Sequence, residues 1–157
     1  MKRSLSSPVI VTIEDDEGHA ILIRENLEAA GLGNEFVHLR NGQEALDFLF
    51  RRGGPAPEFP RFDPERPYVL LLDIRMPKVD GIEVLRQVKA DVELRPLPVV
   101  MLTTTDDERD VERCYFLGCN AYLRKPLDYD AFVSSIRNLA RFLGSLELPA
   151  PLGACPP

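Results

Sequence analysis

The sequence predicts an α/β fold in which five parallel strands alternate with five helices, a (βα)5 doubly wound sheet. Short apolar runs rich in branched residues alternate with stretches of helical period, which is the pattern of βαβ units. The run at 69–72 is continuously apolar rather than alternating, as in strands that are buried on both faces. The 157 residues fit one domain with one core.

The elements follow one another in a regular order. Strands are predicted at 9–13, 35–39, 68–72, 99–102 and 121–123, and helices at 19–30, 41–50, 82–90, 108–117 and 129–146. The apolar face of the first helix is predicted from four residues: Ile21, Leu22, Leu27 and Ala30. Gly31 marks the end of this helix.

The later helices carry their own signals. The second opens with Asn41 and has Glu44 three residues on, the spacing of a capping box. The fourth ends before Gly118. Apolar residues at helical spacing predict the core face of the fifth: Phe132, Ile136, Leu139 and Leu143.

Two segments fall outside the alternation. Residues 51–67 (RRGGPAPEFPRFDPERP) form a long loop rich in proline, and loops of this length are usually functional or mobile. Residues 149–157 hold four more prolines and are expected to be a frayed, flexible tail.

Composition excludes several classes of protein. The net charge of −6 disfavours binding to the phosphates of DNA or RNA. No apolar run approaches the roughly 20 residues that cross a bilayer, and no signal peptide is evident, so we expect a cytoplasmic protein without membrane contact. Three cysteines are too few for a disulfide framework, and Cys114 and Cys119 are best read as small buried hydrophobes.

Polar side chains gather directly after the predicted strands. The first strand is followed by the acidic residues 14–17, the third by Asp73, the fourth by the threonines 103–105, and the fifth by Arg124 and Lys125. Because parallel strands end at one edge of a sheet, these groups should converge there. At neutral pH, neighbouring carboxylates need either a shared proton or a cation, and Mg²⁺ suits two or three oxygens with open positions for a phosphate.

Each of these residues has a plainer explanation when it is taken alone. The acidic residues 14–17 could stabilise a helix N-terminus, and Lys125 could be a solvated surface residue. Thr103 could simply finish a strand. Their common position at strand ends favours the functional interpretation, a Mg²⁺-dependent phosphoryl site in which a carboxylate is the nucleophile.

These residues resemble the receiver domain of two-component response regulators. The resemblance runs over residues 8–148 and is carried by four motifs: IEDD at 13–16, LLLDIRMPKVDG at 70–81, VVMLTTT at 99–105 and YLRKP at 122–126. It implies the flavodoxin-like fold of the chemotaxis regulator, with strand order 2-1-3-4-5. It also implies a phosphoacceptor signalling domain that assists its own phosphorylation and dephosphorylation, and not an enzyme.

The resemblance assigns roles at the site. Asp73 is similar to the phosphoacceptor, and the expected ligands of Mg²⁺ are the side chains of Glu14, Asp15 and Asp73 together with the backbone carbonyl of Arg75. Thr103 resembles the switch hydroxyl, and Lys125 resembles the lysine that contacts the phosphate.

A second group of residues is assigned to switching and to the lifetime of the phosphorylated state. Tyr122 resembles the aromatic residue that turns inward on phosphorylation, and Pro126 is expected to follow a cis peptide bond. Arg75, Thr104 and Thr105 stand where receivers tune hydrolysis of the acyl phosphate.

The resemblance also indicates which classes of protein the chain partners. The loop 51–67, KADVELRPLP at 89–98 and SLELP at 145–149 resemble stand-alone receivers that partner phytochrome-type histidine kinases. We expect no output domain, so the signal should leave by a protein contact, by relay to a histidine phosphotransfer protein or by feedback on the kinase. Surplus apolar residues predict a homodimer face: Tyr115, Val133, Phe142 and Leu146.

Two other interpretations compete. Aspartate-nucleophile phosphatases need a second Asp two positions after the first, where this chain has Arg75. A non-phosphorylated pseudo-receiver acting as a dimeric scaffold would usually lack an acid or the lysine, and both are present here. No P-loop motif occurs.

Overall fold

A computed structural model describes residues 7–52 and 61–147, which form a five-stranded parallel sheet in the order β2-β1-β3-β4-β5. The strands are β1 (Val9–Ile13), β2 (Phe36–Leu39), β3 (Tyr68–Leu72), β4 (Val99–Thr103) and β5 (Ala121–Arg124). The helices are α1 (Glu17–Ala29), α2 (Gly42–Leu49), α3 (Gly81–Ala90), α4 (Glu108–Leu117) and α5 (Tyr129–Ser145). The predicted fold class and strand order are therefore confirmed.

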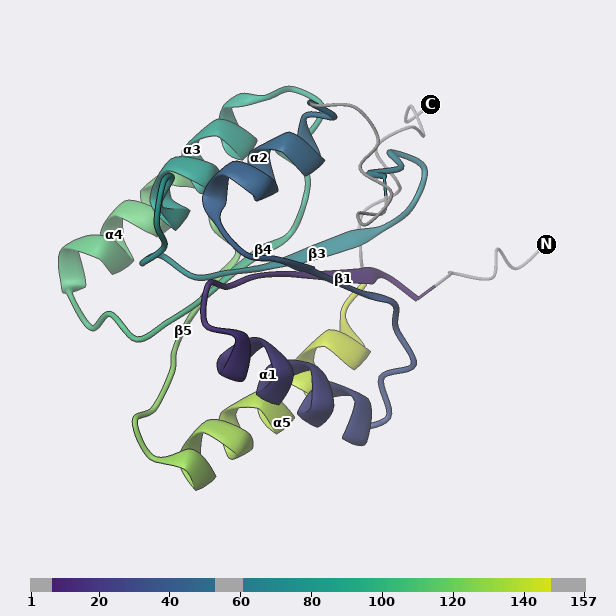
Figure 1. The fold of residues 1–157 in the computed structure, drawn as a ribbon, viewed down its shortest axis with the longest axis vertical. Coiled ribbons are helices and arrows are strands. Elements are labelled where there is room, and N and C mark those ends of the chain that lie inside the picture. Colours follow the sequence, from purple (N-terminus) through teal and green to yellow (C-terminus); the bar gives the residue numbers. More distant parts are fainter. Residues whose placement is uncertain (1–6, 53–60, 148–157) are drawn as a thin grey trace.

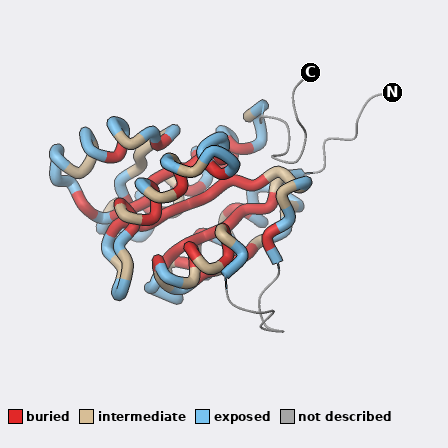
Figure 2. The backbone as a smooth tube through the Cα atoms, turned by 90° about the horizontal axis from the view of Figure 1, so that it is seen from above, coloured by how far each residue is buried: buried red, intermediate tan, exposed pale blue. Residues whose placement is uncertain are grey.

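The helices cover both faces of the sheet. Figure 1 shows α1 and α5 side by side on one face and α2, α3 and α4 on the other. Side chains of one strand alternate between the two layers: in β1, Val9, Val11 and Ile13 pack under α2–α4, whereas Ile10 packs under α1 and α5. All five residues of each of β1, β3 and β4 are buried, and all but Thr12 and Thr103 are apolar. These strands form the buried centre in Figure 2.

Every helix begins at a side chain that caps it. The N-cap residues accept a hydrogen bond from a main-chain N–H of the first turn: Asp16, Asn41, Asp80, Asp107 and Asp128. The cap at Asp16 starts α1 two residues earlier than the sequence pattern suggested. The predicted cap at Asn41 is confirmed, since its Oδ1 lies 2.9 Å from the amide nitrogen of Glu44.

The predicted apolar face of α1 was partly wrong. Leu27 is buried, but Ile21 is 55% exposed and Ala30 is also exposed. The residues that α1 buries with Leu27 are Ala20 and Ile23, so the buried stripe is rotated from the predicted one. The predicted core face of α5 is confirmed, because all four of its residues are buried.

Part of the long loop 51–67 folds onto the amino ends of the strands. Phe62 is buried and stacks on Tyr68 with ring centroids 4.7 Å apart, and its edge meets Phe48 at 5.6 Å. The amide of Asp63 donates a hydrogen bond to the Tyr68 hydroxyl. Residues 53–60 and the predicted tail 149–157 lie outside the described residues.

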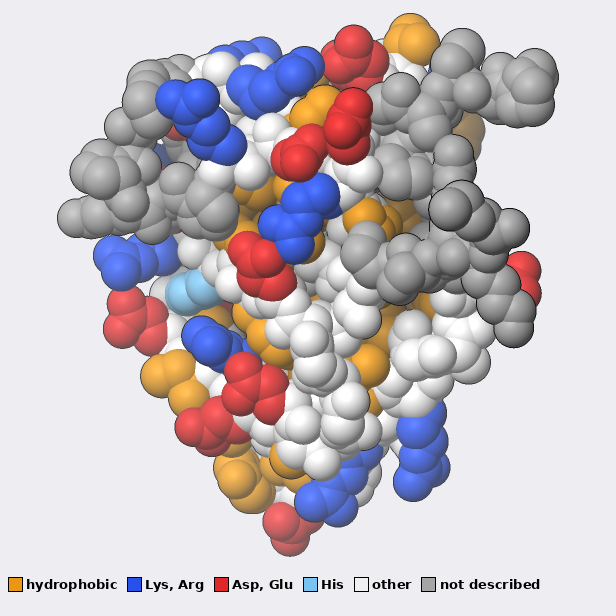
Figure 3. Space-filling view, turned by 90° about the vertical axis from the view of Figure 1, so that its right-hand side faces the viewer, with side chains coloured by type: hydrophobic (Ala, Val, Ile, Leu, Met, Phe, Trp, Pro, Cys, Tyr) orange, Lys and Arg blue, Asp and Glu red, His pale blue; other side chains and the backbone are white. Residues whose placement is uncertain are grey.

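Three further features of the described residues concern their surface charge, their cysteines and the length of their helices. Figure 3 shows the face at the amino ends of the strands, where acidic and basic side chains are interspersed. Cys114 and Cys119 are buried and free, as predicted. Within residues 7–52 and 61–147, every helix is too short or too polar to traverse a lipid bilayer.

Glycines at two positions, Gly42 and Gly81, allow two segments of main chain to approach each other closely. A Cβ at Gly81 would overlap the main-chain carbonyl oxygen of Asp73, and a Cβ at Gly42 would overlap that of Val79. The amide of Gly81 also donates to the carbonyl of Ile74 at 2.8 Å. The start of α3 therefore lies directly against the end of β3.

Substitution Gly81→Ala should displace the backbone at Asp73. Because the obstacle is main chain and cannot turn away, we expect a loss of about 1–3 kcal/mol in the free energy of unfolding, measured by urea denaturation. Gly33→Ala is the matched control, since nothing lies within 4 Å of a Cβ there. We expect that variant to be unchanged or stabilised by up to about 1 kcal/mol. Equal stabilities for the two variants would contradict the described contact.

Candidate functional site

Three carboxylates meet at the carboxyl ends of the central strands. The register pairs Ile13 with Leu72, so Glu14, Asp15 and Asp73 follow at the same edge of the sheet. Their nearest ligand atoms all lie within 4.8 Å of one another. Glu14 and Asp73 are buried, whereas Asp15 is exposed to solvent. The group thus combines two buried acids with one that faces outward.

Lys125 places its ammonium group among these acids. Pairing of Thr103 with Arg124 brings β5 beside β4, and the amide of Lys125 donates to the carbonyl of Thr103 at 2.8 Å. The side chain is only 2% exposed; its Nζ donates to Glu14 Oε2 and lies 3.6 Å from Asp73 Oδ2. A buried ammonium between two buried carboxylates is not a solvated surface lysine.

The carboxyl group of Glu14 sits in an environment that resists its ionisation. Burial raises its pKa to about 7, Lys125 opposes the rise, and the neighbouring Asp73 adds to it. Asp73 is oriented differently: its Oδ1 accepts a hydrogen bond from the amide of Ile74 at 2.8 Å, while Oδ2 faces Lys125. One oxygen of Asp73 is thus fixed by the backbone.

The threonines after β4 differ in their exposure. Thr103 is fully buried, and its Oγ1 lies 3.4 Å from the amide nitrogen of Thr105. Thr104 is exposed. Thr105 is buried, and its carbonyl accepts a hydrogen bond from the hydroxyl of the half-buried Tyr122 at 3.1 Å. The segment after β4 is therefore tied to β5 through Tyr122.

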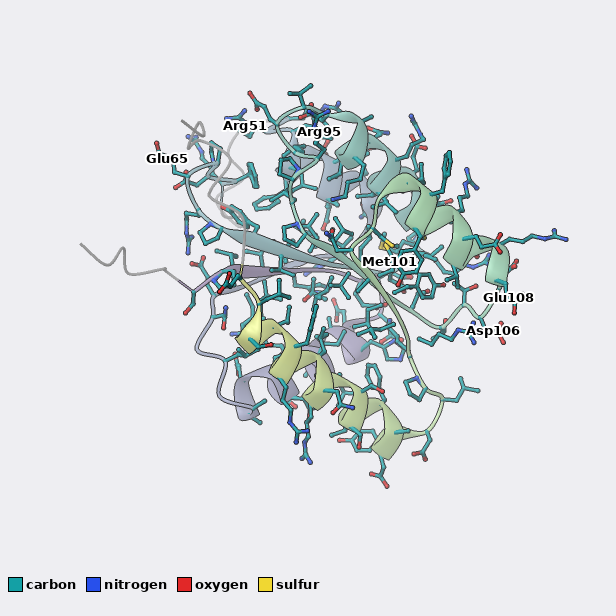
Figure 4. The ribbon with its side chains drawn as sticks, turned by 180° about the vertical axis from the view of Figure 1, so that it is seen from behind. Arg51, Glu65, Arg95, Met101, Asp106 and Glu108 are labelled. Atoms are coloured by element: carbon teal, nitrogen blue, oxygen red, sulfur yellow. The ribbon has the colours of Figure 1, made fainter. Side chains whose placement is uncertain are left out.

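Arg75 and Asp110 lie on the α4 side of the site. The exposed guanidinium of Arg75 lies 3.9 Å from Asp110, whose carboxylate accepts a hydrogen bond from the Thr105 hydroxyl at 3.2 Å. Figure 4 places Asp106 and Glu108, from the same segment, at this end of the molecule, opposite Arg51, Glu65 and Arg95. Asp110 was not among the predicted site residues.

A histidine that the sequence analysis did not assign to the site also reaches Lys125. His19, in the first turn of α1, places Nδ1 3.3 Å from Lys125 Nζ. The second histidine, His38 on β2, places Nε2 2.7 Å from the main-chain oxygen of Glu14. The usable signal for His19 was its position one turn after the acidic residues, at the start of the helix that follows the first strand.

The prediction for Pro126 was wrong. No cis peptide bond occurs in the described parts of the chain, so the bond before Pro126 is trans. The trans form is intrinsically preferred for prolines too, by about 0.5–1 kcal/mol. In this structure Lys125 reaches Glu14 and Asp73 with the trans bond.

The predicted dimer-face residues do not form one continuous patch. Tyr115 is 51% and Phe142 49% exposed, whereas Val133 is half-buried and Leu146 packs against the core beneath α5. Val133 and Phe142 are nine residues apart, which is two and a half helical turns, so they lie on opposite sides of α5. Tyr115 and Phe142 are the two large exposed members.

The donor set fits a hard divalent cation. Carboxylate oxygens are the ligands preferred by Mg²⁺ and Mn²⁺, and a small cation would offset the repulsion among Glu14, Asp15 and Asp73. Arg75, whose carbonyl was predicted to join them, follows Asp73 by two positions in the loop after β3. The geometry can hold a metal ion beside Asp73 while Lys125 approaches the same carboxylate from the other strand.

Comparisons with known proteins agree with this arrangement. Residues 10–137 match the response regulator receiver domain. The chain is 35% identical over 143 residues to response regulator Rcp1 of Synechocystis, covering 90% of this chain and 93% of Rcp1. It superposes on the Mn²⁺-bound form of Rcp1 with a TM-score of 0.80 at 33% identity, covering 91% of this chain and 99% of that one.

Two further solved structures are similar. A response regulator receiver domain from Rhodospirillum rubrum has a TM-score of 0.81 and 41% identity, with coverage of 91% of this chain and 98% of that one. The phosphorylated cyanobacterial phytochrome response regulator RcpA has a TM-score of 0.79 and 33% identity, with coverage of 91% and 99%.

The pKa of Glu14 predicts how stability varies with pH. The pKa is about 7 in the folded chain, against an ordinary value of 4.5. Between pH 4.5 and about pH 7, the folded state therefore keeps a proton on Glu14 that the unfolded state has released. This stabilisation is complete below the lower value and is lost as the pH rises through the upper one. In EDTA, the free energy of unfolding of the wild type should therefore fall more between about pH 5.5 and 8.5 than that of Glu14→Gln.

Urea denaturation at several pH values measures this difference. The exposed Glu112 provides the matched control, because Glu112→Gln should retain the pH dependence of the wild type. A divalent cation added at the upper pH should stabilise the wild type more than Glu14→Gln, since binding only the folded state stabilises it. Parallel pH profiles for the wild type and Glu14→Gln would refute the interpretation of Glu14.

Proposed function

The chain belongs to the response regulator receiver domain family, and on that premise we propose that Asp73 accepts a phosphoryl group from a histidine kinase. In this step an oxygen of Asp73 bonds to phosphorus, and the bond from phosphorus to the kinase histidine nitrogen breaks. The nitrogen keeps the bonding electron pair and takes up a proton. The product is an acyl phosphate on Asp73, and the chain signals through altered protein contacts.

The position of Asp73 carries this proposal. Its carboxylate is buried, one oxygen is held by the amide of Ile74, and the other lies 3.6 Å from the ammonium of Lys125. A cation beside the acceptor oxygen stabilises the charge that the phosphoryl oxygens carry during transfer. Mg²⁺, held by Glu14, Asp15, Asp73 and the carbonyl of Arg75, supplies further positive charge when it is bound.

Relatives support the metal and the phosphorylation. Rcp1 has a Mn²⁺-bound form, and RcpA is known in a phosphorylated form. Because RcpA is a phytochrome response regulator, the proposed kinase of this chain is of the phytochrome type. A histidine phosphotransfer protein is the proposed recipient if the phosphoryl group is passed on.

The signal would leave through the segment after β4. Thr103 is the proposed switch hydroxyl, and its movement toward a phosphoryl group would disturb the neighbouring Thr105 that Tyr122 holds. Two-state packing of such a segment is a common switching device. Exposed Thr104 and Arg75, with Thr105, are proposed to set how quickly water reaches the acyl phosphate.

Intact-protein mass after incubation with acetyl phosphate tests the proposal. The wild type should gain one phosphoryl group in the presence of Mg²⁺ and none in EDTA. Asp73→Asn should gain none, because the amide is a far weaker nucleophile than the carboxylate.

Lys78→Met is a control for Lys125→Met, since Lys78 is exposed. The rate of phosphorylation should be unchanged in the control and lowered at least about tenfold in Lys125→Met, as expected for loss of a charged transition-state contact. No gain of mass in the wild type, together with no binding of beryllofluoride, would instead favour a non-phosphorylated scaffold.

The exposed aromatic residues support a homodimer as the assembled form. Tyr115 on α4 and Phe142 on α5 are each about half exposed, and aromatic residues are enriched at protein–protein interfaces. Val133, on the opposite side of α5 from Phe142, and Leu146, which packs against the core, contribute less to this proposal.

Light scattering with and without beryllofluoride tests the dimer. The wild type should have twice the mass of one chain, and Phe142→Glu should shift the mass toward that of one chain, because a charge would be buried at the interface. Val92→Glu is the control, since Val92 is 72% exposed and lies after α3. A monomeric wild type under both conditions would exclude the dimer.

A further inference from the structure

We infer that His19 is a positioning residue for Lys125, holding its ammonium group toward Asp73 through a hydrogen bond accepted by Nδ1. The inference rests on the proposed phosphoacceptor function and deepens it, because it names a residue that acts through the lysine. His19 belongs to α1 and Lys125 follows β5, so the contact joins two elements that are distant in sequence.

The environment of Lys125 supports this role. Three groups surround Nζ: Glu14 accepts a hydrogen bond, Asp73 lies at 3.6 Å, and His19 Nδ1 lies at 3.3 Å. The lysine side chain is almost completely buried, and an ammonium has three N–H donors to satisfy. His19 is the uncharged member of the three when its ring is neutral.

The difference between the carboxylates and His19 matters for phosphoryl transfer. Glu14 and Asp73 are also the proposed metal ligands, so their oxygens have competing partners. The imidazole is not among the proposed metal ligands, and its Nδ1 lies closer to Lys125 Nζ, at 3.3 Å, than to its other charged neighbour, Asp16 Oδ2, at 3.9 Å. A neutral imidazole also does not cancel the charge of the lysine as a carboxylate does. His19 can therefore orient the ammonium while leaving its charge for the incoming phosphoryl oxygens.

His19 is itself held in place from two directions. Its amide donates to Asp16 Oδ1 at 3.0 Å, which caps α1. Its ring packs against Phe132 of α5, with centroids 5.7 Å apart and planes inclined by 53°. For Nδ1 to accept from Lys125, the ring proton of the neutral form must be on Nε2.

Two substitutions separate positioning from packing. His19→Phe keeps an aromatic ring against Phe132 but removes the acceptor, whereas His19→Asn keeps an acceptor near the Nδ1 position and loses the ring. If His19 positions Lys125, phosphorylation by acetyl phosphate with Mg²⁺ should slow about 5- to 10-fold in His19→Phe, the effect of one lost hydrogen bond. The rate in His19→Asn should lie closer to that of the wild type.

The opposite order, a normal rate in His19→Phe and a slow one in His19→Asn, would show that the ring only packs and would overturn the inference. Equal rates in all three proteins would also overturn it. Failure of the wild type to be phosphorylated is a different result, because it rejects the proposed function and leaves the His19 contact to be tested separately.

NMR of the wild type provides that separate test without phosphorylation or metal. The chain has two histidines, so the ¹⁵N signals of His19 are assigned by their loss in His19→Phe. We expect a neutral ring protonated at Nε2, and a Lys125 ammonium signal that shifts in His19→Phe. A ring protonated at Nδ1, or an unchanged ammonium signal, would refute the contact even if a variant folded poorly.

Discussion

The site depends on the ion pairs that the buried ammonium group of Lys125 makes with Glu14 and Asp73. Burial strengthens attraction and repulsion alike, so two buried acids this close need either a proton or a cation between them. One lysine does not balance three carboxylates, and burial raises the pKa of Glu14 even though Lys125 opposes the rise. The site is therefore suited to take up further positive charge, as a divalent metal ion would bring.

The buried sheet holds the charged side chains of the site close together. The strands β1, β3 and β4 are buried along their whole length, and their registers fix where each chain leaves the sheet. Close approach at Gly81 then sets the backbone after Asp73 against the start of α3. A rigid apolar frame thus holds polar groups at distances that a flexible loop could not maintain.

Much of the fold and of the candidate site could be predicted because local sequence patterns indicate where the strands lie and which residues follow them. Apolar runs located the strands, and the rule that parallel strands end at one edge grouped Glu14, Asp73, Thr103 and Lys125. Ile21 was misplaced because α1 has apolar residues on more than one side, and the packing of α1 against α5 decides which side is buried. His19 escaped notice since its partner Lys125 is 106 residues away.

The resemblance to a known family added roles that no local pattern supplies, such as phosphoacceptor for Asp73. It also carried over a cis bond before Pro126 that this structure does not have. The contacts of Asp110 with Arg75 and Thr105 follow from the placement of α4 and not from motif spacing. These are the features that a structure adds to a family assignment.

Measuring the coupling energy between Lys125 and Glu14 tests most directly the claim that the site depends on the buried lysine. A double-mutant cycle with Lys125→Met and Glu14→Gln, measured by urea unfolding at about pH 8 in EDTA, separates their interaction from their individual contributions. The account predicts that Lys125→Met destabilises the wild type by about 3–5 kcal/mol, and that the loss is smaller by about 1–3 kcal/mol when Glu14 is already Gln. Additive losses would mean that the two side chains do not depend on each other, and would contradict the account.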